Sequence, residues 1–169
     1  MSATPGNPSE RPFVEATFIT PSGGLAMRRV DEVEAIAGCG LRGDRYCERR
    51  GYWTDVDECQ VTLIEGEGLD EIERQAGLSV HNGEHRRNIV TRGIRLQDLA
   101  GRRFRIGEAV LEYDRPRRPC RYIEMITQPG MTRALIGRGG ICARVITGGR
   151  IRVGDAITIV EAEGAAERP

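Results

Sequence analysis

The chain has 169 residues and a mass of 18.7 kDa, which suits one domain with a single core. Its 25 basic residues are all arginine and balance 25 acidic residues, and the resulting formal net charge of zero argues against a general binder of nucleic acids or anionic membranes. Because there is no lysine, a lysine Schiff base and a P-loop lysine are excluded, and we expect no covalent pyridoxal phosphate.

Both ends of the chain carry few apolar side chains. We therefore expect flexible tails over residues 1–12 and 163–169, and a single folded domain over residues 13–162. The polar start and the lack of a long apolar run predict neither a secretory signal nor a membrane anchor. The five cysteines include no C-x-x-C pair, a pattern that we interpret as suiting a reducing compartment, and we expect a cytoplasmic protein.

Short apolar stretches alternate with glycine-rich turns, and this pattern predicts a mainly β protein. The expected strands are 13–19, 27–36, 61–64, 88–91, 103–106, 109–113, 143–147 and 156–160. Many short strands with few helices favour a closed or nearly closed β-barrel over a doubly wound sheet.

Three glycine-containing pairs predict turns between these strands. Gly107-Glu108 is a glycine-first, two-residue hairpin loop. Gly148-Gly149 and Gly154-Asp155 predict two more turns, and hence an antiparallel meander at the C-terminal end. One amphipathic helix is expected from about Gly66 to Gln75, followed by a glycine that stops it.

The segment "RPRRPCRYIE" surrounds Cys120 with four arginines and two prolines. Nearby positive charge stabilises a thiolate over a thiol, so this cysteine is a candidate soft metal ligand or sulfur nucleophile. The alternative is an exposed loop in which Cys120 only packs against its neighbours. The other four cysteines, at 39, 47, 59 and 142, are expected to be small apolar residues that fill space.

The segment "HRRNIVTRGI" places Arg86, Arg87 and Asn88 directly before an apolar strand. An arginine fork beside an amide suits a phosphate or a fused heterocycle, and the alternative is a solvated charge cluster. If the segment is extended, neighbouring side chains point to opposite faces. We therefore expect at most one of Arg86 and Arg87 to lie close to Asn88.

Two glycine-rich segments are further candidates for ligand binding. In "GLRGDRY" an Asp-Arg pair either holds the loop through bonds to the backbone or presents a carboxylate to a ligand. In "GRGGICARV" the backbone amides of Gly137, Gly139 and Gly140 could cradle an anion, although the spacing is neither a Walker loop nor a dinucleotide fingerprint.

Taken in order, "GLRGDRY", "QVTLIE", "RRNIVTRGI", "LAGRRFRIGEAVLE", "RRPC" and "GRGGICARVITGGRIRVGD" resemble a stand-alone MOSC domain, the type named after the C-terminal domain of molybdenum cofactor sulfurase. The resemblance covers residues 15–160. It implies a strand-rich β-barrel with a few short helices that binds the molybdenum cofactor, a pterin dithiolene with a terminal phosphate. In relatives this cofactor supports two-electron reduction of N-hydroxylated compounds.

The resemblance also implies roles for individual residues. Cys120 matches the family's cysteine after proline and is expected to ligate molybdenum or carry a persulfide. Arg87 and Asn88 would bind the pterin or its phosphate, and Arg86 would point to the opposite face of the extended segment. Arg45, Gly139 and Gly140 match further signature positions of the cofactor site. The chain departs from the pattern at Tyr46, where bacterial relatives often have histidine, and at Ile123, where the reductase branch has a second cysteine.

We therefore expect a molybdenum-dependent oxidoreductase that reduces N-hydroxylated small molecules. The sequence contains no flavin, haem or iron–sulfur motif, so electrons are expected from a separate reductase. The alternative is a module that carries or delivers the cofactor or sulfur without turning over a substrate. No nucleic-acid or membrane partner is expected.

Overall fold

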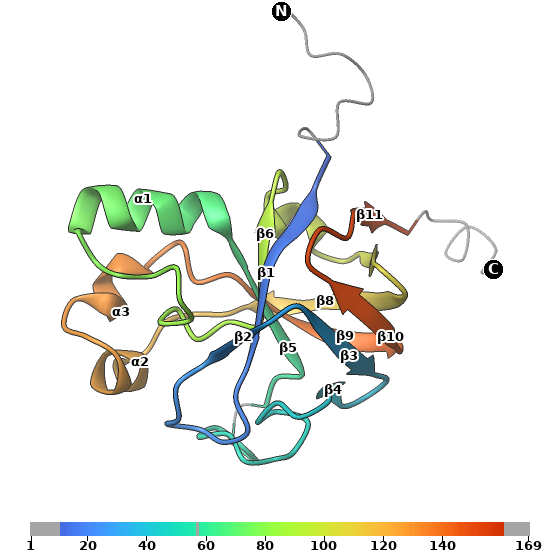
Figure 1. Ribbon diagram of the computed structural model, residues 1–169, viewed down its shortest axis with the longest axis horizontal. Coiled ribbons are helices and arrows are strands. Elements are labelled where there is room, and N and C mark those ends of the chain that lie inside the picture. Colours follow the sequence, from blue (N-terminus) through green and yellow to red (C-terminus); the bar gives the residue numbers. More distant parts are fainter. Residues whose placement is uncertain (1–10, 57, 161–169) are drawn as a thin grey trace, which may run out of the picture.

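The computed structural model describes residues 11–56 and 58–160, which form two β-sheets and a group of short helices (Figure 1). Residues 1–10 and 163–169 of the expected tails lie outside the described residues. The described part is mainly β, as expected.

The larger sheet has eight strands in the order β11-β7-β8-β9-β5-β6-β1-β2. Its neighbouring strands are antiparallel except for β5 and β6, which are parallel and are connected through a helix. The strands are β1 (Phe13–Ile19), β2 (Arg28–Val30), β5 (Val61–Glu65), β6 (Ile89–Arg92), β7 (Arg103–Ile106), β8 (Ala109–Pro116), β9 (Ile141–Thr147) and β11 (Ile157–Ile159).

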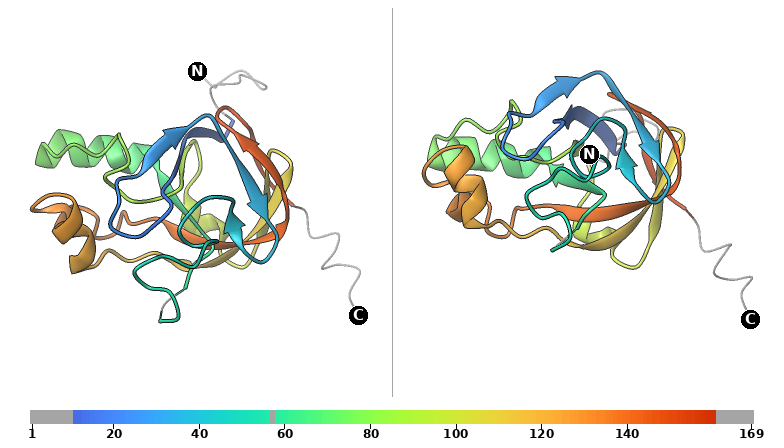
Figure 2. Two further views of the ribbon diagram at one scale, coloured as in Figure 1. Left: turned by 60° about the horizontal axis from the view of Figure 1, so that its bottom comes forward. Right: turned by 90° about the horizontal axis from the view of Figure 1, so that it is seen from below.

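The smaller sheet has the order β10-β3-β4 and contains β3 (Glu32–Ile36), β4 (Gly40–Leu41) and β10 (Gly149–Arg152). The expected closed barrel is therefore wrong, because the strands form two open sheets that curve past each other (Figure 2). Between β1 and the start of β11 the pairing is reduced to one bridge, Phe13 with Ala156. A single bridge does not make the continuous ladder that closes a barrel.

The C-terminal meander is also wrong. β9 pairs with β8 and β5, β10 pairs with β3, and β11 pairs with β7, so the three consecutive strands do not neighbour one another. The chain changes sheet at Gly148 and Gly149, and the same happens at Asp31, which divides the expected strand 27–36 into β2 and β3. The hairpin at Gly107 is confirmed: Ile106 pairs with Ala109, and Gly107 has the positive φ of 58° that such a turn requires.

The expected helix is confirmed as α1 (Gly66–Ala76), which ends at Gly77 in the left-handed conformation. The resemblance implied a few short helices without placing them, and the structure has η2 (Leu96–Leu99), α2 (Arg121–Ile126) and α3 (Met131–Ala134). None of the helices in the described ranges has the length and apolar character that crossing a bilayer requires.

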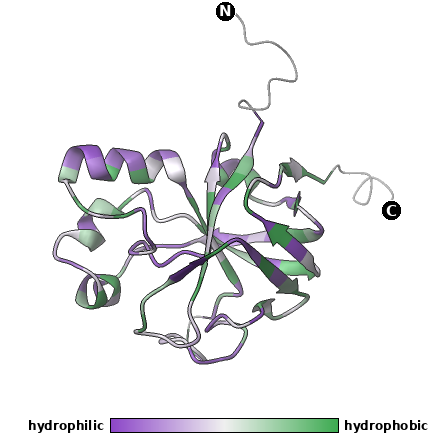
Figure 3. Ribbon diagram, in the orientation of Figure 1, coloured by the Kyte–Doolittle hydropathy of each residue, from purple (hydrophilic) through white to green (hydrophobic). Residues whose placement is uncertain are grey.

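Apolar side chains alternate along the strands and build a core on each face of the larger sheet (Figure 3). On β1, Val14 packs towards the smaller sheet, whereas Ala16 and Phe18 pack towards the helices. In a regular strand these three residues would share one face, so the division arises at the irregularity between Val14 and Ala16, where the register with β6 shifts. The helices contribute Leu69, Ile72, Ile123 and Met131 to the second cluster, which holds α1, α2 and α3 over one end of the sheet.

The fully buried side chain of Asn88 joins three strands at the start of β6. Its Oδ1 accepts hydrogen bonds from the backbone N of Thr62 at 3.0 Å and from Thr62 Oγ1 at 3.2 Å. Its Nδ2 donates to the carbonyl oxygen of Phe18 at 3.0 Å. These bonds connect β1, β5 and β6 and so fix the point at which Arg87 leaves the sheet.

We predict that Asn88→Ala lowers the free energy of unfolding by about 2 to 6 kcal/mol, because two buried backbone groups lose their partner at about 1 to 3 kcal/mol each. Urea denaturation of the variant and the parent measures this difference. Asn82→Ala is the matched control, because Asn82 is exposed and its loss should cost less than about 0.5 kcal/mol. Equal costs for the two variants would contradict the structural role of Asn88.

Candidate functional site

A pocket of about 450 Å³, part of it open to solvent, lies where the loops after β1, β4 and α1 meet the segment that leads into α2. It is lined by five arginines, four aromatic residues and Cys120, and its lining includes no Asp or Glu among the described residues. The arginines are Arg45, Arg86, Arg87, Arg117 and Arg118, and the aromatic residues are Tyr46, Tyr52, Trp53 and Tyr122. A second, open hollow, whose volume of about 990 Å³ includes solvent-exposed space, shares the 117–119 wall with this pocket.

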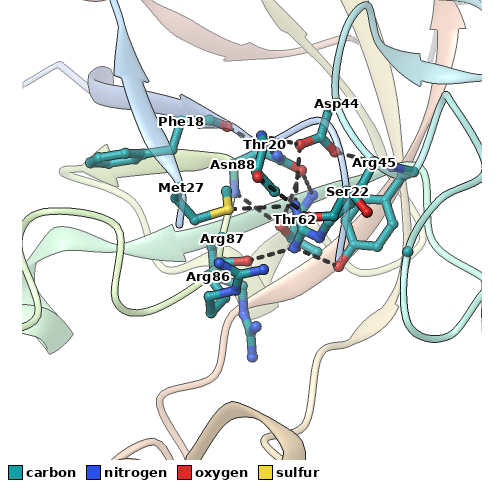
Figure 4. Close-up of polar contacts among 12 residues, drawn as sticks. Phe18, Thr20, Ser22, Met27, Asp44, Arg45, Thr62, Arg86, Arg87 and Asn88 are labelled. Atoms are coloured by element: carbon teal, nitrogen blue, oxygen red, sulfur yellow. Dashed lines mark hydrogen bonds and ion pairs between the residues drawn. The ribbon is translucent and has the colours of Figure 1, made fainter. Parts of the chain in front are cut away.

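Arg45 is held by a buried ion pair with Asp44, their atoms Nη1 and Oδ1 being 3.1 Å apart (Figure 4). Asp44 also accepts hydrogen bonds from the backbone N atoms of Thr20 and Tyr46. Arg45 Nη2 donates to the carbonyl of Arg86 at 3.0 Å, and its guanidinium lies 4.2 Å from the centre of the Tyr46 ring. The aspartate of "GLRGDRY" therefore holds the loop, and the arginine reaches the edge of the pocket.

Arg86 and Arg87 both line the pocket, so the expectation that Arg86 points away is wrong. That expectation assumed an extended chain. Arg86 instead has a φ of 66°, its backbone N donates to the carbonyl of Gly83, and β6 begins only at Ile89. The left-handed residue turns the chain, which brings two consecutive side chains to one side.

Both side chains are buried but are not neutralised. Arg87 is 4% exposed and donates through Nε to the carbonyl of Gly139 at 2.7 Å, and Arg86 is 7% exposed and donates to the carbonyl of Leu25. Within residues 11–56 and 58–160, no carboxylate forms an ion pair with either. Burial lowers the pKa of each to about 10, assisted by the charge of Arg117 at Arg87 and of Arg45 at Arg86. The two guanidinium groups thus supply positive charge that an anion would balance.

Cys120 is half-buried in the pocket wall and lies directly before α2. Its carbonyl accepts hydrogen bonds from Thr132 Oγ1 at 2.8 Å and from the backbone N of Ile123, which fix the backbone of this lining residue. In the part of the chain that the structure describes, no three His, Cys, Asp or Glu side chains gather into a metal site. A metal here would therefore need most of its ligands from a bound molecule.

Gly139 and Gly140 allow close backbone contacts. A Cβ on Gly139 would lie 2.2 Å from the carbonyl oxygen of Arg117, and a Cβ on Gly140 would lie 1.9 Å from that of Leu63. Both glycines line the second hollow, and Gly139 is also the hydrogen-bond partner of Arg87. The structure therefore brings Arg45, Arg87, Cys120 and this loop together, whereas the side chain of Asn88 is directed into the strands behind Arg87.

The sequence reasoning missed the aromatic part of the pocket. Tyr52 and Tyr122 are stacked with their ring centres 3.8 Å apart, and Trp53 meets Tyr52 edge to face. The stacking joins the loop before β5 to α2, and all three rings line the pocket. The "GYWT" segment, with two adjacent aromatic residues in a polar loop, is the signal that could have revealed it.

The other four cysteines do not all fill space separately, as had been expected. Cys39 and Cys47 form a disulfide, with their Cα atoms 4.8 Å apart, whereas Cys59 and Cys142 are buried free thiols. The eight-residue separation did not reveal the pair, because β4 and the following turn are what bring its two ends together.

His85 supports the arginine segment from within the core. Its Nδ1 accepts a hydrogen bond from the backbone N of Arg87 at 2.9 Å, and its ring meets Phe18 edge to face. Its Nε2 is buried without a hydrogen-bond partner among the described residues. Burial lowers the pKa of His85 to about 3, and the charges of Arg87 and other neighbours act in the same direction.

This pKa predicts a pH-dependent stability. Above the unfolded-state pKa of about 6.5 the contribution of neutral His85 is fully present, and it is lost progressively as the pH falls towards 3, because only the unfolded chain takes up the proton. We predict that the free energy of unfolding falls by about 1.4 kcal/mol per pH unit more steeply in the parent than in His85→Asn between about pH 6 and 4. Denaturant titrations across this range measure the two slopes, and parallel slopes would show that His85 is not the group responsible.

Comparisons with known proteins place the chain in a family. The model of the MOSC domain matches residues 51–158, and a search of curated proteins gave no match. The structure is similar to that of YuaD from Bacillus subtilis, with a TM-score of 0.71 at 20% identity over 88% of this chain and 94% of that one. It is also similar to YiiM from Geobacillus stearothermophilus, with a TM-score of 0.69 at 18% identity over 89% and 75% of the two chains. YiiM from Escherichia coli is similar as well, with a TM-score of 0.65 at 21% identity over 88% of this chain and 70% of that one. With its six sequence blocks, its mainly β fold and the family match over most of its length, the chain belongs to the MOSC domain family.

Proposed function

We propose that the pocket binds the molybdenum cofactor and that the protein reduces N-hydroxylated compounds at the metal. The observation that carries this proposal is the pair of buried arginines, Arg86 and Arg87, which lack a carboxylate partner among the described residues and share one pocket with a half-buried cysteine. An anionic ligand with an open site for a soft donor would satisfy both features.

The residues of the pocket fit such a group in their chemistry. The Cys120 thiolate is a soft ligand, and one such ligand suffices where the bound molecule supplies other sulfur donors. Planar guanidinium groups bind phosphate through paired hydrogen bonds. Arg87 and Arg117 both line the pocket, and Arg117 also lines the adjoining hollow. The larger hollow gives a flat, extended ligand room on the far side of the 117–119 wall.

When bound, the cofactor would supply two-electron redox chemistry at molybdenum. The chain would hold it through Cys120 and the arginines, with Arg45 kept in place by Asp44. The stacked Tyr52 and Tyr122 would limit access of water and select flat substrates, because aromatic faces favour stacked rings. The guanidinium groups would stabilise negative charge that develops near the metal. Electrons would come from a separate reductase.

Molybdenum content tests the role of Cys120. We predict that Cys120→Ser, purified anaerobically from a host that makes the cofactor, retains little molybdenum per chain, because a hydroxyl is a poor ligand for a soft metal site. The matched control is Cys59→Ser, which changes a cysteine outside the pocket and keeps a donor for the carbonyl of Val61. Equal metal in Cys120→Ser and the parent would overturn the assignment.

Turnover separates reduction from cofactor delivery. The metal-loaded parent, supplied with a chemical reductant, is expected to reduce an N-hydroxylated base. Full metal loading without any turnover would instead support the carrier module.

Arg87 gives a second prediction. Arg87→Lys keeps the charge but loses the planar fork and the Nε bond to Gly139, so we expect it to weaken phosphate binding about 10- to 100-fold. Because Arg86 lines the same pocket, Arg86→Lys is expected to weaken binding in the same direction. Titration with inorganic phosphate or pyrophosphate at one fixed salt concentration measures the effect. Arg138→Lys, in the same glycine-rich motif but paired with Glu71 outside the pocket, is the control and should leave the affinity unchanged.

A further inference from the structure

The disulfide between Cys39 and Cys47 closes a loop that carries part of the pocket lined by five arginines, called the arginine pocket below. Its two cysteines are eight residues apart, and Arg45 and Tyr46 of the arginine pocket lie between them. Both cysteines are half-buried and line a separate cavity, whose volume of about 650 Å³ includes solvent-exposed space. The disulfide is therefore not sealed in the core.

The Cys39 end of the loop is fixed by the smaller sheet. Gly40 and Leu41 form β4, which pairs with β3, and the backbone N of Cys39 donates to the carbonyl of Ile36 at 3.0 Å. A Cβ on Gly40 would lie 2.5 Å from the carbonyl oxygen of Gln60, so the two backbones are in direct contact here. This end of the loop keeps its position without help from the disulfide.

The turn around Cys47 is not part of that sheet. Its ends contact the loop after β1, where Arg45 N donates to the carbonyl of Thr20 and Gly23 N donates to that of Arg50. Between these points, and apart from the contact of the two bridged residues, the backbone hydrogen bonds of the described structure stay local. The disulfide is therefore the bond that joins the middle of the turn to the smaller sheet.

Tyr46, the neighbour of Cys47, connects this turn to the arginine pocket. It lines both the arginine pocket and the cavity of the disulfide. Its hydroxyl oxygen accepts a hydrogen bond from Arg45 Nη2 at 3.1 Å, and its ring centre lies 4.2 Å from the Arg45 guanidinium. Arg45 Nη2 also donates to the carbonyl of Arg86 at 3.0 Å. A continuous set of contacts thus leads from the disulfide to the backbone of Arg86.

We propose that the Cys39–Cys47 disulfide is a redox-sensitive clamp on the arginine pocket. When closed, it holds Tyr46, and through it Arg45, in place beside Arg86. When a thiol opens it, the turn loosens, and the pocket binds an anion less tightly because its wall is no longer preorganised. The loosening of the turn is independent of the proposed function, and only the effect on anion binding rests on it.

The reductant is a low-molecular-weight thiol or dithiol that enters the cavity of the disulfide. Its thiolate attacks one sulfur and forms a mixed disulfide, and the other cysteine leaves as a thiolate and takes up the proton that the reductant released. A second thiolate of the reductant attacks the reductant sulfur of the mixed disulfide, and the remaining cysteine leaves and is protonated in the same way. Two electrons pass from the reductant to the cysteines, and the reductant becomes a disulfide.

Amide hydrogen exchange of the native protein, with and without dithiothreitol, tests the clamp. We expect residues 46–49 to exchange faster after reduction, while β1 and β5 keep their rates. Trp53 is the only tryptophan of the chain and lines the arginine pocket together with Tyr46. Quenching of its fluorescence by acrylamide is therefore a second readout, and it should increase on reduction. Unchanged exchange of residues 46–49 together with unchanged quenching would overturn the proposal.

Titration with inorganic phosphate at one fixed salt concentration measures the effect on the pocket. We expect reduction to weaken binding about fivefold or more, the size of a typical coupling between two sites. An affinity that reduction leaves unchanged would overturn the effect of the clamp on the pocket. Absence of phosphate binding to the disulfide form would count against the proposed function instead, and the exchange rates would then decide on the clamp by themselves.

Variants show whether the response belongs to this disulfide. The double variant Cys39→Ser with Cys47→Ser should have the exchange rates and phosphate affinity of the reduced parent, both with and without dithiothreitol. Cys59→Ser is the matched control, because it changes a free cysteine of the same cavity, and it should respond to dithiothreitol like the parent. A double variant that still responds to dithiothreitol would contradict the assignment to Cys39 and Cys47.

Discussion

The side chain of Asn88 joins β1 and β5 at the point where β6 begins, and the geometry of the arginine pocket depends on this contact. Its amide satisfies backbone groups of two other strands in a place that water does not reach. Because Asn88 is fixed, the segment before it, which carries Arg86 and Arg87, meets the sheet at a defined position. His85 fixes the backbone of Arg87 through Nδ1, and the left-handed Arg86 turns the chain so that both guanidinium groups reach the pocket.

The arginines of the pocket differ in how their charge is balanced. Arg45 is paired with the buried Asp44, so its role in positioning the loop requires no ligand. Arg86 and Arg87 are buried against carbonyl oxygens alone among the described residues, and such burial costs free energy that a bound anion would offset. This contrast supports an anionic ligand, because a purely structural cluster would be expected to pair all of its charges.

One cysteine shares the pocket with these arginines. Cys120 lines the pocket directly before α2, whereas Cys142 is buried on β9. The same positive charges that suit a phosphate also stabilise thiolates. A cluster of arginines can therefore serve anion binding and a thiolate ligand together, and the proposed cofactor site draws on both.

The local sequence determined several features by itself. The helix that begins at Gly66 and the hairpin at Gly107 follow from side-chain periodicity and from the φ that a glycine-first turn needs, and both depend on neighbours in the chain. The six sequence blocks identified the family, and the arginines around Cys120 marked that segment as a candidate site. These signals are local, or are shared with relatives in order along the chain.

Tertiary structure decided which strands pair and which side chains meet. The residues near Gly149 do not predict that β10 pairs with β3 and that the sheets stay open, because that pairing joins segments more than 100 residues apart. The direction of Arg86 depends on one backbone angle, and the Cys39–Cys47 disulfide depends on β4 and the turn that follows it. Such contacts are set by packing between distant parts of the chain, which short sequence patterns do not record.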